Sequence, residues 1–134
     1  MMRVPFFSAD VRYTKTNEWA RRRGDCVRVG VDDYSQSALG DVVALSLPEA
    51  GARVRAGMAL GSIEATKAVS DLNAPVSGRV AAVNRAVVET PGLVNSDPFG
   101  EGWLIEIEPL DPAEMDALMD VEAYKTWLQG LARQ

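Results

Sequence analysis

The stretch from Gly61 to Gly78 constrains the fold most, because apolar residues near each of its ends enclose a short polar centre. That centre lies between Glu64 and Asp71, and the apolar residues around it are Ile63, Ala65, Val69 and Leu72. The pattern is typical of a β-hairpin whose loop points into water. We therefore expect Lys67 at the hairpin tip. A lysine in this place is usually an ordinary surface residue, but a covalently attached, swinging cofactor would require the same placement.

The composition of the 134-residue chain is that of an ordinary globular protein, with 47% hydrophobic and 25% charged residues. This length suffices for one hydrophobic core, and we expect a single domain over residues 11–134 after an N-terminal extension over residues 1–10. The net charge of −5 argues against nucleic acid or an anionic membrane as partner, since clustered basic residues bind both. The basic run from Arg21 to Arg23 is better explained as a solvated turn.

The cysteine content and the first residues bear on the compartment. Cys26 is the single cysteine of the chain, so an internal disulfide is excluded. The apolar run near the N-terminus is too short for a signal peptide, and no run approaches transmembrane length. We therefore expect a cytoplasmic protein that is not bound to a membrane, and we expect a monomer.

The chain contains no histidine, and this absence limits the chemistry that it can perform alone. Histidine is the most frequent general base, a common metal ligand and the central residue of hydrolase triads. The acidic residues are scattered singly or in pairs and form no calcium-binding loop, and no glycine-rich phosphate loop is present. We therefore expect no intrinsic catalysis and no metal site.

Alternating apolar residues predict several further strands. We expect an early strand from Val11, a hairpin into a strand around residues 27–31, a strand over residues 41–47 and a strand over residues 103–109. In the last of these, Trp103, Ile105 and Ile107 should face the core. A single helical turn is expected over residues 32–40, ended by Gly40.

Two similar turns flank the central hairpin. The stretches starting at Pro48 and Pro75 each read Pro-x-x-Gly before a short strand, and we expect both glycines, Gly51 and Gly78, to adopt positive φ. This arrangement suggests two small sheets packed face to face. The connection over residues 84–102 should wrap the surface and line a cleft. From about residue 111 the period changes to that of helices, which should cover an open side of the β core.

At this point the motifs resemble a known family, the H proteins of the glycine cleavage system. The lysine hairpin, with Thr66-Lys67-Ala68 followed by Ala74-Pro75-Val76-Ser77-Gly78, resembles the lipoyl-lysine hairpin of that family. The other matching stretches, in chain order, are Tyr13-Thr14-Lys15, Glu18-Trp19, Val29-Gly30-Val31, Asp33-Tyr34, Leu39-Gly40-Asp41-Val42-Val43, Leu47-Pro48, Leu93-Val94-Asn95-Ser96-Asp97-Pro98 and Gly100-Glu101-Gly102-Trp103-Leu104. With the residues around these stretches, the resemblance covers roughly Val11 to Tyr124, nearly the whole chain.

The resemblance implies a mainly β fold, a barrel-sandwich of the biotinyl/lipoyl type with two small antiparallel sheets and C-terminal helices. It also implies that lipoate is attached as an amide to Lys67 by a lipoate ligase or a lipoyl/octanoyl transferase. The protein would then be a non-catalytic carrier. Its lipoyl arm would take an aminomethyl group from a pyridoxal-phosphate glycine decarboxylase (P protein), pass it to a tetrahydrofolate-dependent aminomethyltransferase (T protein) and be reoxidised by a flavin (FAD) dihydrolipoyl dehydrogenase.

The resemblance also assigns roles to two acids. Glu18 and Asp71 match residues that lie near the loaded arm in the family, where a carboxylate could pair with the cationic aminomethyl nitrogen. Alternatively, Asp71 fixes its own turn and Glu18 is solvated.

Departures from the family pattern leave a second function open. The usual histidine before Glu18 is Asn17, an aromatic residue near Ala44 is missing, and an acid that commonly follows is Ser46. An H-like lipoate-binding carrier of another pathway, such as sulfur oxidation through a heterodisulfide-reductase-like complex, would share the fold and the modification.

Two other classes of carrier fit the hairpin less well. Biotin carriers usually flank their lysine with methionine, whereas here Thr66 and Ala68 are the neighbours. A lipoyl domain of a dehydrogenase acyltransferase would continue into a flexible linker, whereas this chain ends in predicted helices.

Overall fold

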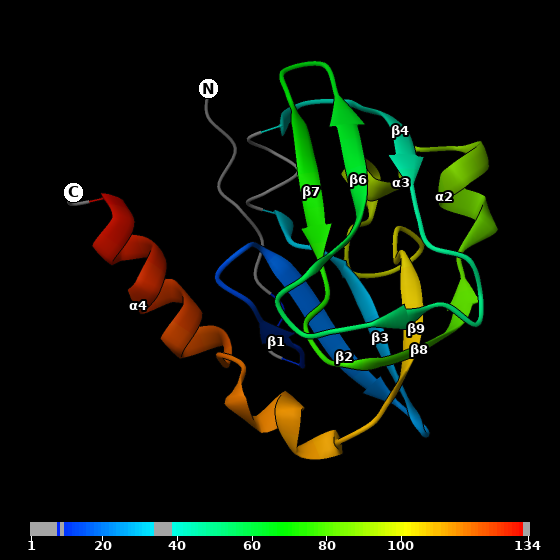
Figure 1. Cartoon of the computed structure of the whole chain (residues 1–134). Coiled ribbons are helices and arrows are strands. Elements are labelled where there is room, and N and C mark those ends of the chain that lie inside the picture. Colours follow the sequence, from blue (N-terminus) through cyan, green and yellow to red (C-terminus); the bar gives the residue numbers. More distant parts are fainter. Residues whose placement is uncertain (1–7, 9, 34–38, 133–134) are drawn as a thin grey trace.

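The computed structural model describes residues 8, 10–33 and 39–132 (Figure 1). The helical turn expected over residues 32–40 falls mostly outside these residues, as does most of the expected N-terminal extension. Gly40 has φ +85°, which agrees with its expected role as the residue that ends that turn.

The larger of two antiparallel sheets has six strands in the order β1-β2-β3-β9-β8-β5. Their bounds are Arg12–Tyr13 (β1), Glu18–Arg23 (β2), Cys26–Val31 (β3), Arg53–Val54 (β5), Gly78–Val83 (β8) and Ile105–Pro109 (β9). The expected early strand is divided in two, because the chain bends at Asn17, whose φ is +72°. The β2–β3 hairpin is confirmed, with Arg23 opposite Cys26 at its turn.

The smaller sheet has three strands in the order β4-β6-β7 and contains the central hairpin. Its strands are Val42–Ser46 (β4), Ala59–Ala65 (β6) and Val69–Asn73 (β7). Figure 1 shows the β6–β7 hairpin extending beyond the other strands. Within the described residues neither sheet closes into a barrel, and the expected mainly β fold with two antiparallel sheets is confirmed.

Helices occupy the remaining segments. Two short ones, α2 (Arg85–Glu89) and α3 (Leu93–Ser96), lie in the connection over residues 84–102, for which we expected no helix in particular, and each buries one valine, Val87 and Val94. A 3-10 helix (Pro112–Ala117) and α4 (Val121–Ala132) form the expected helical C-terminus. The side chain of Asp111 accepts a hydrogen bond from the amide of Ala113 and thus caps the first of these helices.

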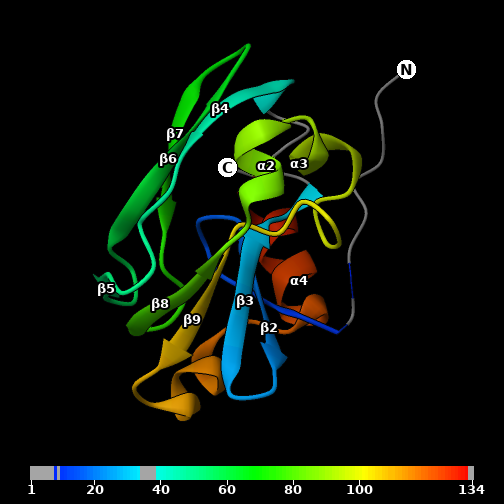
Figure 2. The ribbon, with the colours of Figure 1, turned by 90° about the vertical axis from the view of Figure 1, so that its right-hand side faces the viewer.

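The hydrophobic core lies between the two sheets, which face each other in Figure 2. It takes Ile63 and Leu72 from the smaller sheet and Val80 and Ile107 from the larger sheet, all at most 2% exposed. The two similar Pro-x-x-Gly stretches lead into β5 and β8, which pair with each other in one sheet. They do not therefore belong to opposing sheets.

Two details of the prediction are wrong, the φ of Gly78 and the orientation of Trp103. Gly51 has the expected positive φ, +95°, but Gly78 begins β8 and its φ is not positive. A Cβ at Gly78 would lie 2.1 Å from the carbonyl oxygen of Glu108 on β9, so close strand packing explains this glycine. Leu104 is 1% exposed, whereas Trp103 is half-buried beneath the guanidinium of Arg28, 4.2 Å from the ring centre.

Candidate functional site

The tip of the β6–β7 hairpin consists of Thr66, Lys67 and Ala68, all of which are exposed. The amide of Ala65 donates to the carbonyl of Ala68 at 2.9 Å and closes the turn. Ile63 and Leu72 point into the core from the two strands, so the alternation leaves Glu64 and Asp71 facing solvent. The sequence thus places the polar centre outside the molecule, as expected.

The side chain of Lys67 is accessible, whereas its backbone is fixed. Within the described part of the chain its amine forms no hydrogen bond and no ion pair. Its amide donates to the carbonyl of Leu39 at 3.1 Å, and the amide of Thr66 donates to the carbonyl of Asp41 at 3.0 Å. The tip is therefore hydrogen-bonded to the segment that leads into β4.

Asp71 lies on β7 opposite Ser62, four residues beyond the lysine. Its carboxylate is exposed and has no hydrogen bond or ion pair to any described residue. The alternative that Asp71 fixes its own turn is therefore wrong. This carboxylate is available to a cation that approaches the outer face of the hairpin.

Glu18, the first residue of β2, lies next to the end of β7 that is remote from the tip, and it is 1% exposed. Its carboxylate accepts hydrogen bonds from the hydroxyls of Thr14, at 2.7 Å, and Thr16, and from the amide of Asn73 at 3.1 Å. The alternative that Glu18 is solvated is therefore wrong. Burial raises the pKa of Glu18, although the three donors partly offset this effect by favouring the ionised form.

Glu18 also joins the two sheets, since it belongs to β2 and binds the last residue of β7. Four strand steps of about 3.3 Å separate Val69, next to the tip, from Asn73. Glu18 thus lies roughly 13 Å along β7 from the beginning of that strand. Both predicted acids therefore lie near β7. Asp71 is exposed on that strand, whereas Glu18 comes from β2 and is buried where it bonds to the amide of Asn73.

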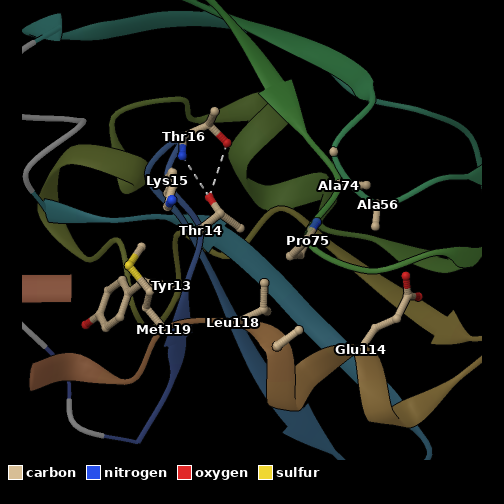
Figure 3. A pocket seen from close by; sticks show the side chains of 12 residues that line it. Tyr13, Thr14, Lys15, Thr16, Ala56, Ala74, Pro75, Glu114, Leu118 and Met119 are labelled. Carbon is tan, nitrogen blue, oxygen red and sulfur yellow. Dashed lines mark hydrogen bonds between the residues drawn. The ribbon is translucent and has the colours of Figure 1, made fainter. Parts of the chain in front are cut away.

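An open hollow of about 480 Å³ adjoins the threonines that hold Glu18 (Figure 3). Thr14 and Thr16 lie on one side, the carboxylate of Glu114 lies on another, and Leu118 and Met119 contribute apolar surface. The expectation that residues 84–102 line a cleft is not met at this hollow, because its lining comes from the segments around residues 13–16, 56–57, 74–75 and 114–119.

We did not predict from the sequence that Asn95 and Gly40 support the tip. The side chain of Asn95 in α3 bonds to the backbone of Gly40 and Val42, and Gly40 lies directly beneath Thr66. Asn95 lies in one of the stretches that resemble the family, but no spacing or periodicity indicates its contacts.

The departures from the family pattern lie in two places. Ala44 and Ser46 are exposed on β4, beside the hairpin. Asn17 directly precedes Glu18 in the chain, and its Oδ1 accepts a hydrogen bond from the hydroxyl of Tyr124 at 2.7 Å.

Other kinds of site find no support in the described residues. They include no group of three histidine, cysteine, aspartate or glutamate side chains that could hold a metal ion. None of the helices that the structure describes is both long and apolar enough to cross a membrane.

Comparisons with known proteins show which family this chain resembles over most of its length. The family model described as "Glycine cleavage H-protein" matches residues 11–130. The chain is 49% identical over 120 residues to the glycine cleavage system H protein of Anaeromyxobacter sp. (strain K), covering 90% of this chain and 94% of the relative. It is 54% identical over 121 residues to the H protein of Mycobacterium avium (strain 104), covering 87% and 92%.

A solved structure shares the fold. A crystal structure of a glycine cleavage system H protein from Mycobacterium marinum superimposes with a TM-score of 0.84 at 38% identity, covering 92% of this chain and 99% of that one. The family model and the relatives extend over nearly the whole chain, and the fold is shared. This chain therefore belongs to the glycine cleavage H-protein family.

Proposed function

We propose that this chain carries lipoate as an amide on Lys67 and serves the glycine cleavage system as its aminomethyl carrier. The observation that carries the proposal is the placement of Lys67. Its amine is exposed at the tip of a hairpin, without a partner among the described residues, on a backbone held by two hydrogen bonds.

This placement suits the attachment reaction. The Lys67 amine, once deprotonated, attacks the carboxyl carbon of activated lipoate; a C–N bond forms, and the bond to the activating group breaks with its electron pair leaving on that group. The nitrogen then loses a proton to solvent, so the amide, unlike the lysine ammonium from which it is made, carries no charge. An enzyme can reach the exposed amine without unfolding the hairpin, because the turn and its two backbone anchors do not involve the side chain.

Once attached, lipoate supplies a disulfide on a long arm, which is reduced as it accepts the aminomethyl group. The chain's own part is to hold the base of that arm still. The partners that we propose are the glycine decarboxylase, the aminomethyltransferase, the dihydrolipoyl dehydrogenase and the enzyme that attaches lipoate.

The two acids support the loaded arm in different ways. Asp71 is exposed on the strand that leads from the tip, and we propose that its carboxylate contacts the cationic aminomethyl nitrogen. Glu18 is buried at the end of the same strand, with three donors around its carboxylate. We propose that it contributes negative potential from there, and it contacts the nitrogen only if the threonine hydroxyls turn aside.

The first test is attachment of lipoate to the full chain. After incubation with a lipoate ligase, lipoate and ATP, the intact mass should show one lipoyl addition. Lys67→Arg should show none, because its guanidinium is not acylated. Lys15→Arg is the matched control, since Lys15 is also exposed, and it should be modified like the wild type. Modification of Lys67→Arg would overturn the proposed site.

The second measurement identifies the pathway. The lipoylated protein, mixed with a glycine decarboxylase, should support exchange of bicarbonate with the carboxyl group of glycine. Absence of exchange in this assay, with an active H protein as the positive control, would favour the H-like carrier of another pathway. Ala44 and Ser46, which depart from the family pattern beside the hairpin, are then the positions to restore first.

A further inference from the structure

Asn95 connects the hydrophobic core to the support beneath the hairpin tip. It lies in α3, next to Val94, which is 0% exposed. Its Nδ2 donates to the carbonyl of Gly40 at 2.9 Å, and its Oδ1 accepts from the amide of Val42 at 2.9 Å. Both ends of one side-chain amide are thus bonded to the same short backbone segment, and exchanging its oxygen and nitrogen would break both bonds.

The segment held by Asn95 is also the segment that holds the tip. Its carbonyls alternate in direction: those of Leu39 and Asp41 accept from the tip, whereas that of Gly40 accepts from Asn95. Asn95 therefore lies on one side of this segment and the lysine hairpin on the other.

Gly40 makes the close approach of the tip possible. Its φ of +85° is a conformation that other residues rarely adopt. A Cβ at this position would lie 2.6 Å from the hydroxyl oxygen of Thr66 and 3.4 Å from Cγ of Lys67. The stem of the lysine thus crosses directly over the segment that Asn95 holds.

We propose that Asn95 is a positioning residue for acylation of Lys67, an inference that rests on the proposed function. By fixing residues 40–42, it keeps the carbonyls of Leu39 and Asp41 where the amides of Lys67 and Thr66 meet them. Without Asn95 the tip samples more conformations. The attaching enzyme then meets the conformation that it can acylate less often, and its apparent affinity for the carrier falls in proportion to the population of that conformation.

The direct test is hydrogen exchange of backbone amides in the unmodified full chain. In Asn95→Ala the amides of Thr66 and Lys67 should exchange about tenfold faster than in the wild type, because the acceptors of both lose their support. The amides of Val80 and Ile107 in the core should keep their protection. Ser96→Ala, an exposed neighbour in the same helix, is the matched control and should change neither set.

The second test measures acylation kinetics with a lipoate ligase. For Asn95→Ala we expect KM for the carrier to rise about tenfold with kcat unchanged, since the bound tip is the same once it has been captured. Val94→Ala removes packing from the same helix and should lower Tm without changing KM. Asn95→Asp keeps the acceptor for Val42 and loses the donor to Gly40, so its KM should lie between those of the wild type and Asn95→Ala.

These readouts separate the inference from the proposed function. Unchanged exchange at Thr66 and Lys67 in Asn95→Ala would overturn the positioning role, whatever happens to acylation. If Asn95→Ala fails to fold, the same exchange measurement on Asn95→Asp decides the question. If the wild type is not acylated at all, the proposed function fails, and the exchange experiment still reports whether Asn95 holds the tip.

Discussion

Glu18 shows how one residue combines structural and electrostatic roles. Its carboxylate is buried between the two sheets, where it receives three hydrogen bonds but faces little water. Ionised carboxylates are destabilised by burial and stabilised by donors, and here burial is the larger effect, so the pKa of Glu18 is raised. Folding is therefore more favourable with Glu18 protonated than with Glu18 ionised.

This raised pKa predicts how Glu18→Gln changes the pH dependence of stability. An acid whose pKa is higher in the folded state contributes stability that is fully present below its unfolded pKa and is lost as pH rises through the folded pKa. Glutamine has nearly the same shape and does not titrate. The stability of Glu18→Gln relative to the wild type should therefore increase with pH. Urea unfolding from about pH 3 to about pH 8 spans the ordinary glutamate pKa and measures this difference. A difference that is constant or falls with pH would contradict the prediction.

At the scale of elements, close contact between strands explains why some glycines are required. A Cβ on Gly61 in β6 would lie 2.1 Å from the backbone carbonyl oxygen of Ser46 in β4. Because this neighbour is backbone, relief requires the strands to separate. Gly92, before α3, has ordinary helical dihedrals, and its Cβ would meet nothing within 4 Å.

These two glycines predict opposite responses to alanine. Gly61→Ala should lower the free energy of unfolding by about 1–3 kcal/mol, the usual effect of overpacking. Gly92→Ala should change it by no more than about 1 kcal/mol, because a compatible backbone position accepts alanine without strain. Equilibrium denaturation of both variants checks the contrast, and equal losses would show that the contact at β4 is not what Gly61 is needed for.

The elements that sequence could predict are those with several alternating residues. The β6–β7 and β2–β3 hairpins have that pattern, and their turns follow from it. Helices α2 and α3 have five and four residues and bury one valine each, so they are too short for their apolar residues to repeat with the period of a helix. The same limit applies to the site. The exposure of Lys67 follows from the hairpin. Asn95, in contrast, bonds to backbone atoms 53 and 55 residues away, and because every residue type has these atoms, the sequence does not indicate the contacts.

At the scale of the whole molecule, the lysine tip and α4 are held by separate contacts. The tip depends on residues 39–42 and α3, whereas α4 lies beside β1, away from the tip (Figure 1). A second hydrophobic cluster secures α4, with Tyr124 stacked on Tyr13 at 4.4 Å between ring centres. The hydroxyl of Tyr124 contacts the side chains of Asn17 and Asp32.

This separation predicts that stability and lysine presentation can be changed independently. Tyr124→Phe keeps the stacked ring and removes a hydroxyl that is fully buried against Asp32. The free energy of unfolding should fall by about 1–3 kcal/mol, because a buried carboxylate loses a donor. Thr126→Ala, on the exposed face of the same helix, should change it much less. KM and kcat for acylation of Lys67 should match the wild type in both variants, since the backbone hydrogen bonds that hold the tip to described residues go to the segment before β4 and not to α4. A raised KM in Tyr124→Phe would show instead that α4 and the lysine tip are coupled. The route would run from Tyr124 to Asn17, to the next residue, Glu18, and through the hydrogen bond of Glu18 with Asn73 into β7.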